Sequence, residues 1–381
     1  MKILFVSHYQ GINGAPKSMI SLICKLREKG IQFLVTIPNH GPLEDELKRH
    51  KIPYCIIVTR ECFFQAEDKN GKIRRWFNEL YNFKAVIQMT KLIRAYNPDI
   101  VHSNSYAIDV GAFAACLTGK PHIWHFREFM KDDFGYLHNM EWKDIWLAKK
   151  SSAIIAVSKT IKEYYEKREG LKNICVVYNG IEEKKYRIDR KTLLDGNKLQ
   201  LLISGTISKG KGQKDAIIAS KILYEKGYRN FQLSIVGDGN TEDVLWLKRM
   251  RNEYALNQYV KFYGFQNDLV AFRKNMDVEL VCSAREAFGR VTIEAMMADM
   301  LVIGADTGGT RELIKDGVNG VLYQQGNPND LADKIEHVIQ NREKYVQCVK
   351  NGKEYAMHHF DISTTARKVL EIYQRITRNI G

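Results

Sequence analysis

Short apolar runs alternate with amphipathic segments of helical length along the first half of the chain. The run at residues 2–7 leads into a turn containing Gly11 and Gly14, and apolar residues at helical spacing follow as far as Gly30. Such an alternation is typical of right-handed βαβ units and a parallel sheet. The strands predicted in this half are residues 2–7, 31–38, 99–103, 122–125, 153–158 and 175–177.

The same alternation returns after residues 182–198, a charged stretch with few apolar side chains that we interpret as a linker. The strands predicted beyond it are residues 200–205, 232–237, 260–264, 278–282, 301–304 and 320–323, and the helices are 214–226, 241–254, 291–298, 331–340 and 364–378. The pattern therefore predicts an α/β protein of two Rossmann-like domains with parallel sheets. Ligands of such sheets bind at the carboxyl ends of the strands.

Length and composition agree with two ordinary domains. The chain has 381 residues, of which 45% are hydrophobic and 27% charged. Its longest nearly apolar stretch, residues 110–117, is far shorter than the roughly 20 residues that span a bilayer. The chain turns polar at Ser7, too early for the apolar region of a signal peptide, so we expect a cytoplasmic protein. The seven cysteines are scattered without a C-x-x-C pair, which argues against a disulfide framework or a zinc ribbon.

The formal net charge of +14 is concentrated in the first half, where residues 1–180 hold 27 basic and 18 acidic side chains. Such an excess suits nucleic acid, an anionic membrane or phosphorylated substrates. Charge alone does not choose among these partners.

Two glutamates mark the most specific motif. Glu286 falls in the loop after a predicted strand, and Glu294 lies on the helix that follows. The backbone amides of Phe288, Gly289 and Arg290 stand near the start of that helix, where they can donate to hydroxyls or a phosphate. The alternative is structural: one glutamate near the positive end of the helix dipole and one ordinary surface glutamate.

A second loop after a strand, residues 205–213, is rich in glycine and carries Lys209 and Lys211. Glycines let the backbone approach an anion, and a lysine can neutralise a pyrophosphate leaving group. The loop has neither the Walker spacing nor G-x-G-x-x-G, so by itself it is a weak motif. In the first half, residues 11–17 could bring amides to an anion, and His125 ends a strand where a sugar-contacting side chain would stand.

Taken together, these motifs resemble a retaining glycosyltransferase of family 4 with the GT-B fold. The resemblance covers essentially the whole chain, and its strongest part is the family's E-x7-E signature at Glu286–Glu294. The signature stands in full context, from residues 278–283 to residues 307–312. Residues 316–320 and 179–181 also match.

The resemblance implies a role for each matching residue. Lys211 would bind the donor's pyrophosphate, Glu294 the ribose hydroxyls, and Glu286 the transferred sugar, aided by the amides of Phe288 and Gly289. Gly14 would approach the phosphate, and His125 would face the donor sugar or the reacting centre. The implied catalytic set is His125, Glu286 and Lys211, and the implied donor site is Gly14, Thr206, Lys211, Glu286, Phe288, Gly289 and Glu294.

Two positions depart from the family pattern. Thr206 stands where the family usually has an arginine that shares the pyrophosphate, so one positive charge is missing there. Lys209, Arg290 and Arg127 are the candidate replacements. The glycine pair of the N-terminal loop appears here as Asn13-Gly14, which weakens that contact.

The function that the resemblance implies is retaining hexosyl transfer. The donor would be a nucleotide sugar, with UDP favoured and GDP the alternative, and the acceptor a lipid-linked or polysaccharide glycan of the bacterial cell surface. Protein cations and helix dipoles would stabilise the leaving group, so we expect no metal and no other cofactor, in keeping with the lack of a D-x-D motif. Residues 1–182 would bind the acceptor and residues 183–360 the donor, on two sheets facing a central cleft. The last helix, about 361–381, would cross back to the first domain.

Residues 72–77, Lys-Ile-Arg-Arg-Trp-Phe, open a helical stretch that continues through Lys84 and Lys91. Cations beside Trp and Phe suit peripheral docking on anionic lipid at the inner face of the cell membrane. The alternative is a Rossmann helix whose apolar side, with Phe77, Leu80, Val86 and Ile93, packs on the sheet. Residues 129–146, which hold several aromatic side chains, would form either a lip over the acceptor or part of the core.

Two other functions stay open. A GT-B UDP-sugar epimerase would share the nucleotide site, although the E-x7-E context argues against it. A basic nucleic-acid-binding protein would use the charge, but the chain has no recognised nucleic-acid motif and we expect no such partner. A Rossmann dehydrogenase is disfavoured because Gly11 and Gly14 replace G-x-G-x-x-G after the first strand.

Overall fold

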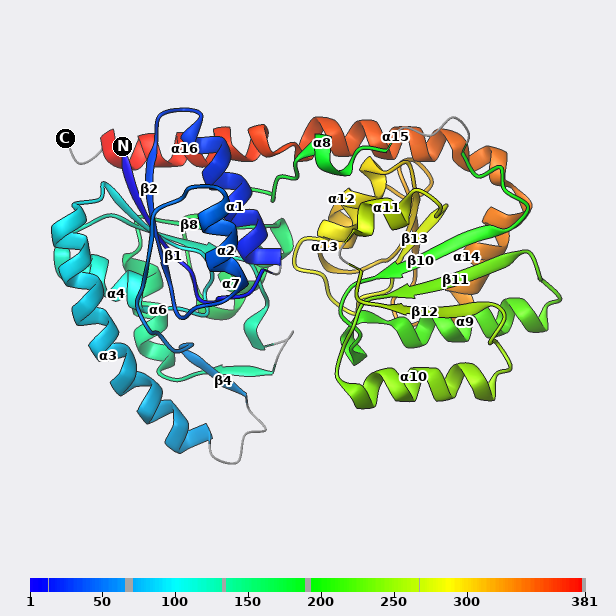
Figure 1. Cartoon of the computed structure of the whole chain (residues 1–381), viewed down its shortest axis with the longest axis horizontal. Coiled ribbons are helices and arrows are strands. Elements are labelled where there is room, and N and C mark those ends of the chain that lie inside the picture. The colour runs from blue at the N-terminus through cyan, green and yellow to red at the C-terminus, as the bar shows by residue number, and fades with distance from the viewer. Residues whose placement is uncertain (13, 66–70, 132–134, 189–192, 267, 379–381) are drawn as a thin grey trace. The chain divides into compact units, whose positions relative to one another are not determined.

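The computed structural model describes residues 1–12, 14–65, 71–131, 135–188, 193–266 and 268–378. The chain divides into two compact units. Unit 1 is residues 1–180 with 362–381, and unit 2 is residues 181–361. Each contains one parallel sheet with helices on both faces, so the predicted pair of Rossmann-like α/β domains is confirmed (Figure 1).

The unit 1 sheet has seven strands in the order β3-β2-β1-β5-β6-β8-β9, and every neighbouring pair is parallel. Its central strands are buried at nearly every position because helices cover both faces, which explains their unbroken apolar runs. The strands are β1 (Lys2–Val6), β2 (Gln32–Ile37), β3 (Tyr54–Ile56), β5 (Ile100–Ser103), β6 (His122–Phe126), β8 (Ala153–Ala156) and β9 (Ile174–Val176).

A small antiparallel ribbon of β4 (Phe63–Gln65) and β7 (Tyr136–His138) lies outside this sheet. The helices of unit 1 are α1 (Gly14–Arg27), α2 (Pro42–Arg49), α3 (Gly71–Tyr96), α4 (Val110–Thr118), α6 (Glu141–Lys150), α7 (Lys159–Glu169) and α16 (Ile362–Arg378). The predicted final helix is therefore present, and it belongs to unit 1. It lies along α1, and its buried residues Val369, Ile372 and Ile376 join the core beneath it (Figure 1).

The unit 2 sheet has six parallel strands in the order β12-β11-β10-β13-β14-β15. They are β10 (Leu199–Ser204), β11 (Phe231–Val236), β12 (Val260–Gly264), β13 (Val278–Val281), β14 (Leu301–Ala305) and β15 (Val321–Tyr323). The helices are α8 (Glu183–Tyr186), α9 (Gln213–Glu225), α10 (Thr241–Glu253), α11 (Leu269–Arg273), α12 (Arg290–Met297), α13 (Gly308–Leu313), α14 (Pro328–Gln340) and α15 (Arg342–Phe360), with a 3-10 turn at Lys209–Lys211.

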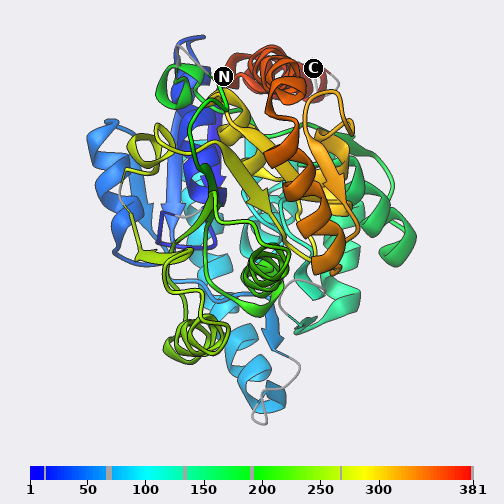
Figure 2. The same ribbon diagram turned by 90° about the vertical axis from the view of Figure 1, so that its right-hand side faces the viewer.

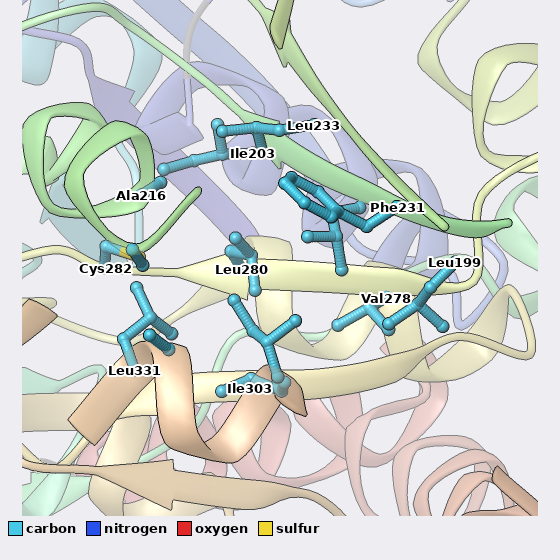
Figure 3. Close-up of a cluster of buried hydrophobic side chains, with 14 of the residues drawn as sticks. Leu199, Ile203, Ala216, Phe231, Leu233, Val278, Leu280, Cys282, Ile303 and Leu331 are labelled. Carbon is cyan, nitrogen blue, oxygen red and sulfur yellow. The ribbon is translucent and has the colours of Figure 1, made fainter. Parts of the chain in front are cut away.

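The core of unit 2 lies between one face of its sheet and the helices α9 and α14, which also contact each other. Figure 2 looks onto this unit, with α9 and α10 seen end-on in green beside the yellow strands. Figure 3 shows Leu280 of β13 and Cys282, which follows that strand, gathered with Ala216 of α9 and Leu331 of α14. The helices hold the sheet rigid, and its carboxyl edge is left to the loops.

The interpretation of residues 182–198 as a linker was wrong in its described part. Residues 183–186 form α8, and Tyr186, Ile188 and Leu194 are buried in unit 2, with Leu194 in its main core. The few apolar side chains of this charged stretch are the ones that unit 2 buries. Residues 189–192 lie outside the described residues.

The alternative in which the apolar side of the helix opening at residues 72–77 packs on the sheet was wrong for its first turns. Val86 and Ile93 of α3 are buried, but Phe77 and Leu80 are 61% and 62% exposed. The side chains of residues 71–74 are not described. Within the described residues, no helix is both long enough and apolar enough to cross a membrane.

Candidate active site

The loop that follows β10 brings Lys211 to Glu286. The Lys211 ammonium lies 3.0 Å from the Glu286 carboxylate, and both side chains are partly exposed. Gly212 makes this approach possible: its φ is +74°, and a Cβ there would stand 2.1 Å from the Cys282 carbonyl oxygen. The Ala284 amide donates to the Gly210 carbonyl at 2.9 Å, which ties the two loops together. Gly210 and Gly212 thus allow the loop that carries Lys211 to pack against the end of β13.

The loop after β14 supports Glu286 from the other side. The Gly309 amide donates to the Glu286 carbonyl at 2.6 Å. A Cβ on Gly308 would come within 2.7 Å of that carbonyl, and one on Gly309 within 2.5 Å of the Phe288 carbonyl. These two glycines therefore allow close packing against the Glu286 loop.

Phe288 and Gly289 lead into α12, where the sequence predicted amide donors. Phe288 is buried, and its ring centroid lies 5.8 Å from that of Phe360. Gly289 is the N-cap of α12 with φ 94°, a conformation that favours glycine. The start of α12 is consequently held next to Glu286, with its positive dipole end at the same edge.

Glu294, one turn into α12, is hydrogen-bonded to two arginines. It accepts from Arg273 Nη1 and from Arg290 Nε, each at 3.0 Å. Arg273 is fully buried and also donates to Glu279 of β13 at 3.2 Å. Burial raises the pKa of Glu279, although Arg273 opposes that effect. The two carboxylates outweigh the burial of Arg273 and raise its pKa, so the guanidinium stays charged.

Arg273 was missed by the sequence analysis. A signal for it existed, because Glu279 sits inside a strand whose other positions are apolar, and a buried carboxylate needs a partner. Ser204 is a second partner of the Glu279 carboxylate, since its hydroxyl donates to it at 2.6 Å. Ser204 is the last residue of β10, so this network reaches the start of the Lys211 loop.

Two of the candidates for the missing phosphate cation, Arg290 and Lys209, have different surroundings. Arg290 pairs with Glu294 and donates to the Tyr186 hydroxyl at 3.3 Å. Lys209 is exposed at the 3-10 turn. Thr206 itself is exposed, and its carbonyl accepts from Gln213 at 3.0 Å. Lys209 and Lys211 are therefore the cations of this loop that face solvent.

In unit 1, His125 of β6 is buried beside Arg127 and His102. Its Nδ1 lies 3.2 Å from Arg127 Nη2 and 3.3 Å from His102 Nε2. Because a guanidinium can only donate, Nδ1 accepts and the proton of the neutral ring sits on Nε2. His125 Nε2 has no hydrogen-bond partner among the described residues. The ring therefore presents an unused N–H donor.

The same chain of hydrogen bonds extends to the C-terminal helix. If His102 Nε2 donates to His125, its Nδ1 must accept, and the Tyr373 hydroxyl stands 2.7 Å from that atom. Burial, reinforced by Arg127, holds the pKa of both His102 and His125 well below the usual range. Both rings are neutral at physiological pH.

Arg127 uses its donors inside unit 1. Nε and Nη2 bind the side chain of Asn104 at 3.1 and 2.9 Å, and Nη1 binds Asn179 at 2.7 Å. It thus joins the loops that follow β5, β6 and β9. Gly14 begins α1, and a Cβ there would meet nothing within 4 Å, while Asn13 lies outside the described residues.

A hollow of 240 Å³ opens in unit 1 between the β4–β7 ribbon and α7. Its lining is aromatic and carries charges of both signs, with Phe63, Tyr136, His138, Arg168 and Glu169 among its residues. Burial alone would lower the pKa of His138, but Asp144 and Glu169 raise it to about 9. Residues 130–131, 136–138 and 141 contribute, so part of the segment predicted as lip or core lines this hollow.

The His, Cys, Asp and Glu side chains of the described residues form no group of three that could hold a metal ion. The polar groups at the two carboxyl edges are instead suited to hydrogen bonding and to neutralising negative charge.

The two units match two family descriptions. Residues 12–185 match Glycosyltransferase Family 4, and residues 184–355 match Glycosyl transferases group 1. The protein is a glycosyltransferase of the GT-B type.

Relatives of the glycosyltransferase cover most of its length. An uncharacterized glycosyltransferase of Methanocaldococcus jannaschii, MJ1178, is 28% identical over 352 residues, 88% of this chain and 93% of that protein. The capsular polysaccharide biosynthesis glycosyltransferase CapM of Staphylococcus aureus is 27% identical over 304 residues, 73% and 77% of the two chains.

Solved structures agree on the fold. The crystal structure of Anabaena Alr3699/HepE in complex with UDP has a TM-score of 0.83 at 24% identity and covers 98% of this chain and all of that one. The lipopolysaccharide outer core galactosyltransferase WaaB has a TM-score of 0.73 at 20% identity, with 98% and 100% covered. At these identities the likeness establishes the GT-B fold.

Proposed function

We propose that this glycosyltransferase transfers a hexosyl group, with retention and without a metal ion, from a nucleotide sugar to a lipid-linked or polysaccharide acceptor of the cell surface. UDP is the favoured nucleotide and GDP the alternative. The observation that supports this proposal most directly is the ion pair of Lys211 and Glu286 at the carboxyl edge of the unit 2 sheet, with Glu294 one turn into the helix α12 that follows Glu286. The UDP bound to HepE and the capsular role of CapM support the donor and acceptor classes.

The leaving diphosphate is assigned to Lys211 and the start of α12. In the free protein Lys211 pairs with Glu286. A bound diphosphate would take over the ammonium, which releases the Glu286 carboxylate to accept from hydroxyls of the sugar. Removal of a preorganised donor of this kind typically lowers kcat by about 100- to 1,000-fold.

Glu294 is assigned to the ribose hydroxyls. Its two oxygens each accept one bond from an arginine, and a carboxylate oxygen has a second acceptor position. The arginines therefore fix the direction of the carboxylate and leave it able to accept from a diol.

His125 is assigned to the donor sugar through its Nε2–H. A neutral, buried donor can bind a sugar hydroxyl without adding charge near the reacting carbon. In the transfer, the bond from the anomeric carbon to the phosphate oxygen breaks, and a bond to the acceptor oxygen forms on the same face. The acceptor's proton passes to the departing phosphate oxygen, so the reaction needs no separate base.

The hollow beside the β4–β7 ribbon supports acceptor binding by unit 1. Its aromatic walls suit sugar rings, and Arg75, Lys131 and Arg168 suit the phosphate of a lipid-linked glycan. With such an acceptor the enzyme would work in the cytoplasm, in peripheral contact with the inner face of the membrane.

Thermal unfolding with a panel of nucleotides and nucleotide sugars, in EDTA throughout, tests the donor site. A ligand of the folded state adds about 2.7 kcal/mol of stability at one hundred times its Kd. We expect a clear shift with one nucleoside diphosphate family and its loss in Glu294→Gln, each variant being compared with its own ligand-free melting. Glu253→Ala, an exposed position on α10, is the matched control. A shift with RNA or DNA and with no nucleotide would instead favour the nucleic-acid-binding alternative.

Proton NMR of the reaction, with the donor that gives the largest shift, tests the chemistry. We expect turnover in EDTA and a product with the donor's anomeric configuration. An inverted product, or turnover only after divalent metal is added, contradicts the mechanism. Conversion of the donor to its epimer without an acceptor would favour the epimerase.

A further inference from the structure

The first turns of α3 expose a large apolar surface. Its members, which we call the outer face of α3, are Trp76, Phe77, Leu80, Tyr81, Phe83 and Ile87. Their exposed fractions run from 46% at Ile87 to 67% at Trp76. Soluble proteins rarely leave so many large neighbouring side chains in water unless the surface binds something.

The outer face is continuous because of its spacing. Trp76, Leu80, Phe83 and Ile87 follow at four, three and four residues, so they share one side of the helix. The opposite side is also apolar, with Met89 and Ile93 buried against the core. In both views the first turns of α3 project from the rest of unit 1 (Figures 1 and 2). The helix is therefore apolar on two sides, and unit 1 covers only one of them.

Positive charge accompanies the outer face. Lys84, Lys91 and Arg94 are exposed further along the same helix. Most of the excess positive charge of the chain lies in unit 1, which carries this helix. Unit 1 has 31 basic and 19 acidic residues, a net charge of +12, whereas unit 2 has 27 basic and 25 acidic residues, a net charge of +2.

A neighbouring helix adds to the surface. Trp142 and Trp146 of α6 are 72% and 42% exposed and stand one turn apart. The Lys143 ammonium between them forms an ion pair with Glu79 of α3, so the two helices are held together at this point. Lys149 and Lys150 end α6 as exposed cations.

We propose that the outer face of α3, with Trp142 and Trp146 of α6, docks unit 1 on an anionic bilayer surface. Trp, Tyr and Phe beside Lys and Arg is the composition of helices that lie at the membrane interface. The negative potential of such a surface attracts a unit of net charge +12. A second copy fits this face less well, because two equally basic units would repel. The inference deepens the proposed function, since a lipid-linked acceptor is presented at a membrane.

Co-sedimentation with lipid vesicles tests the surface. We expect the full chain to bind vesicles of phosphatidylcholine mixed with phosphatidylglycerol, to bind pure phosphatidylcholine much more weakly, and to be released by salt. In W76S/F83S the affinity for anionic vesicles should fall roughly tenfold or more, because two large side chains no longer enter the interface. L245S/W246S is the matched control: it removes two exposed apolar side chains from α10 of unit 2 and should bind as the unaltered chain does.

Three results would overturn the proposal. One is equal vesicle binding by W76S/F83S and the unaltered chain, and another is equal binding to charged and neutral vesicles. The third is a dimer in light scattering that W76S/F83S dissociates, which would assign the face to a second copy. Vesicle binding needs no donor, and W76S/F83S should keep its melting shift with nucleotide. A failure of the docking surface is therefore distinguishable from a failure of the proposed donor site.

Discussion

The carboxyl edges of the two sheets use buried polar groups in opposite ways. In unit 1, neutral imidazoles surround one guanidinium, with His102 and His125 beside Arg127. In unit 2, two guanidiniums, Arg273 and Arg290, alternate with carboxylates. The two sheets have the same parallel architecture, so the contrast shows that topology sets where the polar groups stand, and the side chains alone set how each edge responds to protons.

This difference makes unit 1 the part that should respond to mild acid. His102, His122 and His125 are buried, and burial lowers the pKa of each, in His122 to about 3. The unfolded chain takes up these protons near pH 6.5, and the folded unit does not. The unfolding free energy of unit 1 is therefore highest above pH 6.5 and decreases as the pH falls below it. Each histidine contributes a decrease of up to about 1.4 kcal/mol per pH unit. His8, whose pKa burial lowers to about 4, adds to this loss. Asp144, whose pKa burial raises to about 7, and His138, whose pKa its carboxylate partners raise to about 9, oppose it, so the net loss is smaller than the sum over the lowered histidines.

Denaturant unfolding followed by tryptophan fluorescence can isolate unit 1. Four of the five tryptophans lie there, so in Trp246→Phe the signal reports on unit 1 alone. We expect several kcal/mol of stability to be lost between pH 7 and pH 5. Hydrogen exchange in unit 2, whose histidines are His337, His358 and His359 on the surface, should change little after correction for intrinsic rates. Equal losses in both units would remove the contrast.

The second prediction concerns the charges of unit 2. Arg273→Met leaves Glu279 buried without its cation, which should cost about 3–5 kcal/mol of unfolding free energy. Adding Glu279→Leu should recover most of the loss, because an apolar pair of similar size can replace a buried ion pair. Urea unfolding of the two variants measures this. If the double variant is no more stable than the single one, the contact of Arg273 with Glu294 carries the stability.

The smallest effect is expected at the end of the histidine chain. Tyr373→Phe removes one hydrogen bond to His102, worth about 1 kcal/mol. It also releases the constraint on His102, so the proton of that ring should redistribute between its nitrogens. Nitrogen-15 NMR of the imidazoles reports this: Nε2 of His102 should become only partly protonated, whereas Nε2 of His125 should stay protonated because Arg127 still donates to its Nδ1. Tyr345→Phe removes a similar bond, at 2.7 Å to the exposed His337, and should leave those signals unchanged.

The sequence predicted the strands and helices whose side chains form the buried cores. β1, β10 and β13 read as strands because they are buried on both faces, and α16 read as a helix because its apolar stripe is regular. The three-residue strands β3, β4 and β7 were missed, since a half-buried run of that length has no detectable period. For the first turns of α3 the sequence left two interpretations open, docking on lipid and packing on the sheet, because a pattern of apolar residues does not tell which side the sheet leaves uncovered.

The site shows the same limit. From the local motifs, Lys211, Glu286 and Glu294 could be placed at the carboxyl edge of the unit 2 sheet, since each follows a strand of that sheet. Arg273 lies in the five-residue helix α11, where no spacing distinguishes it from a surface arginine. Its partner Glu279 stands out only as a carboxylate within an apolar strand. A partnership of this kind depends on two elements packing together, which the linear sequence does not display.

Because α16 belongs to unit 1, the order of synthesis differs from the order of completion. Unit 2 occupies the 181 residues before the last helix, and at about 5–20 residues per second it emerges over roughly 10–35 s while unit 1 waits. During that interval the unit 1 core lacks Val369, Ile372 and Ile376, and His102 lacks its tyrosine. The second unit to be translated can therefore be the first to finish folding, and a nascent chain stalled before residue 362 would hold a complete unit 2 and an incomplete unit 1.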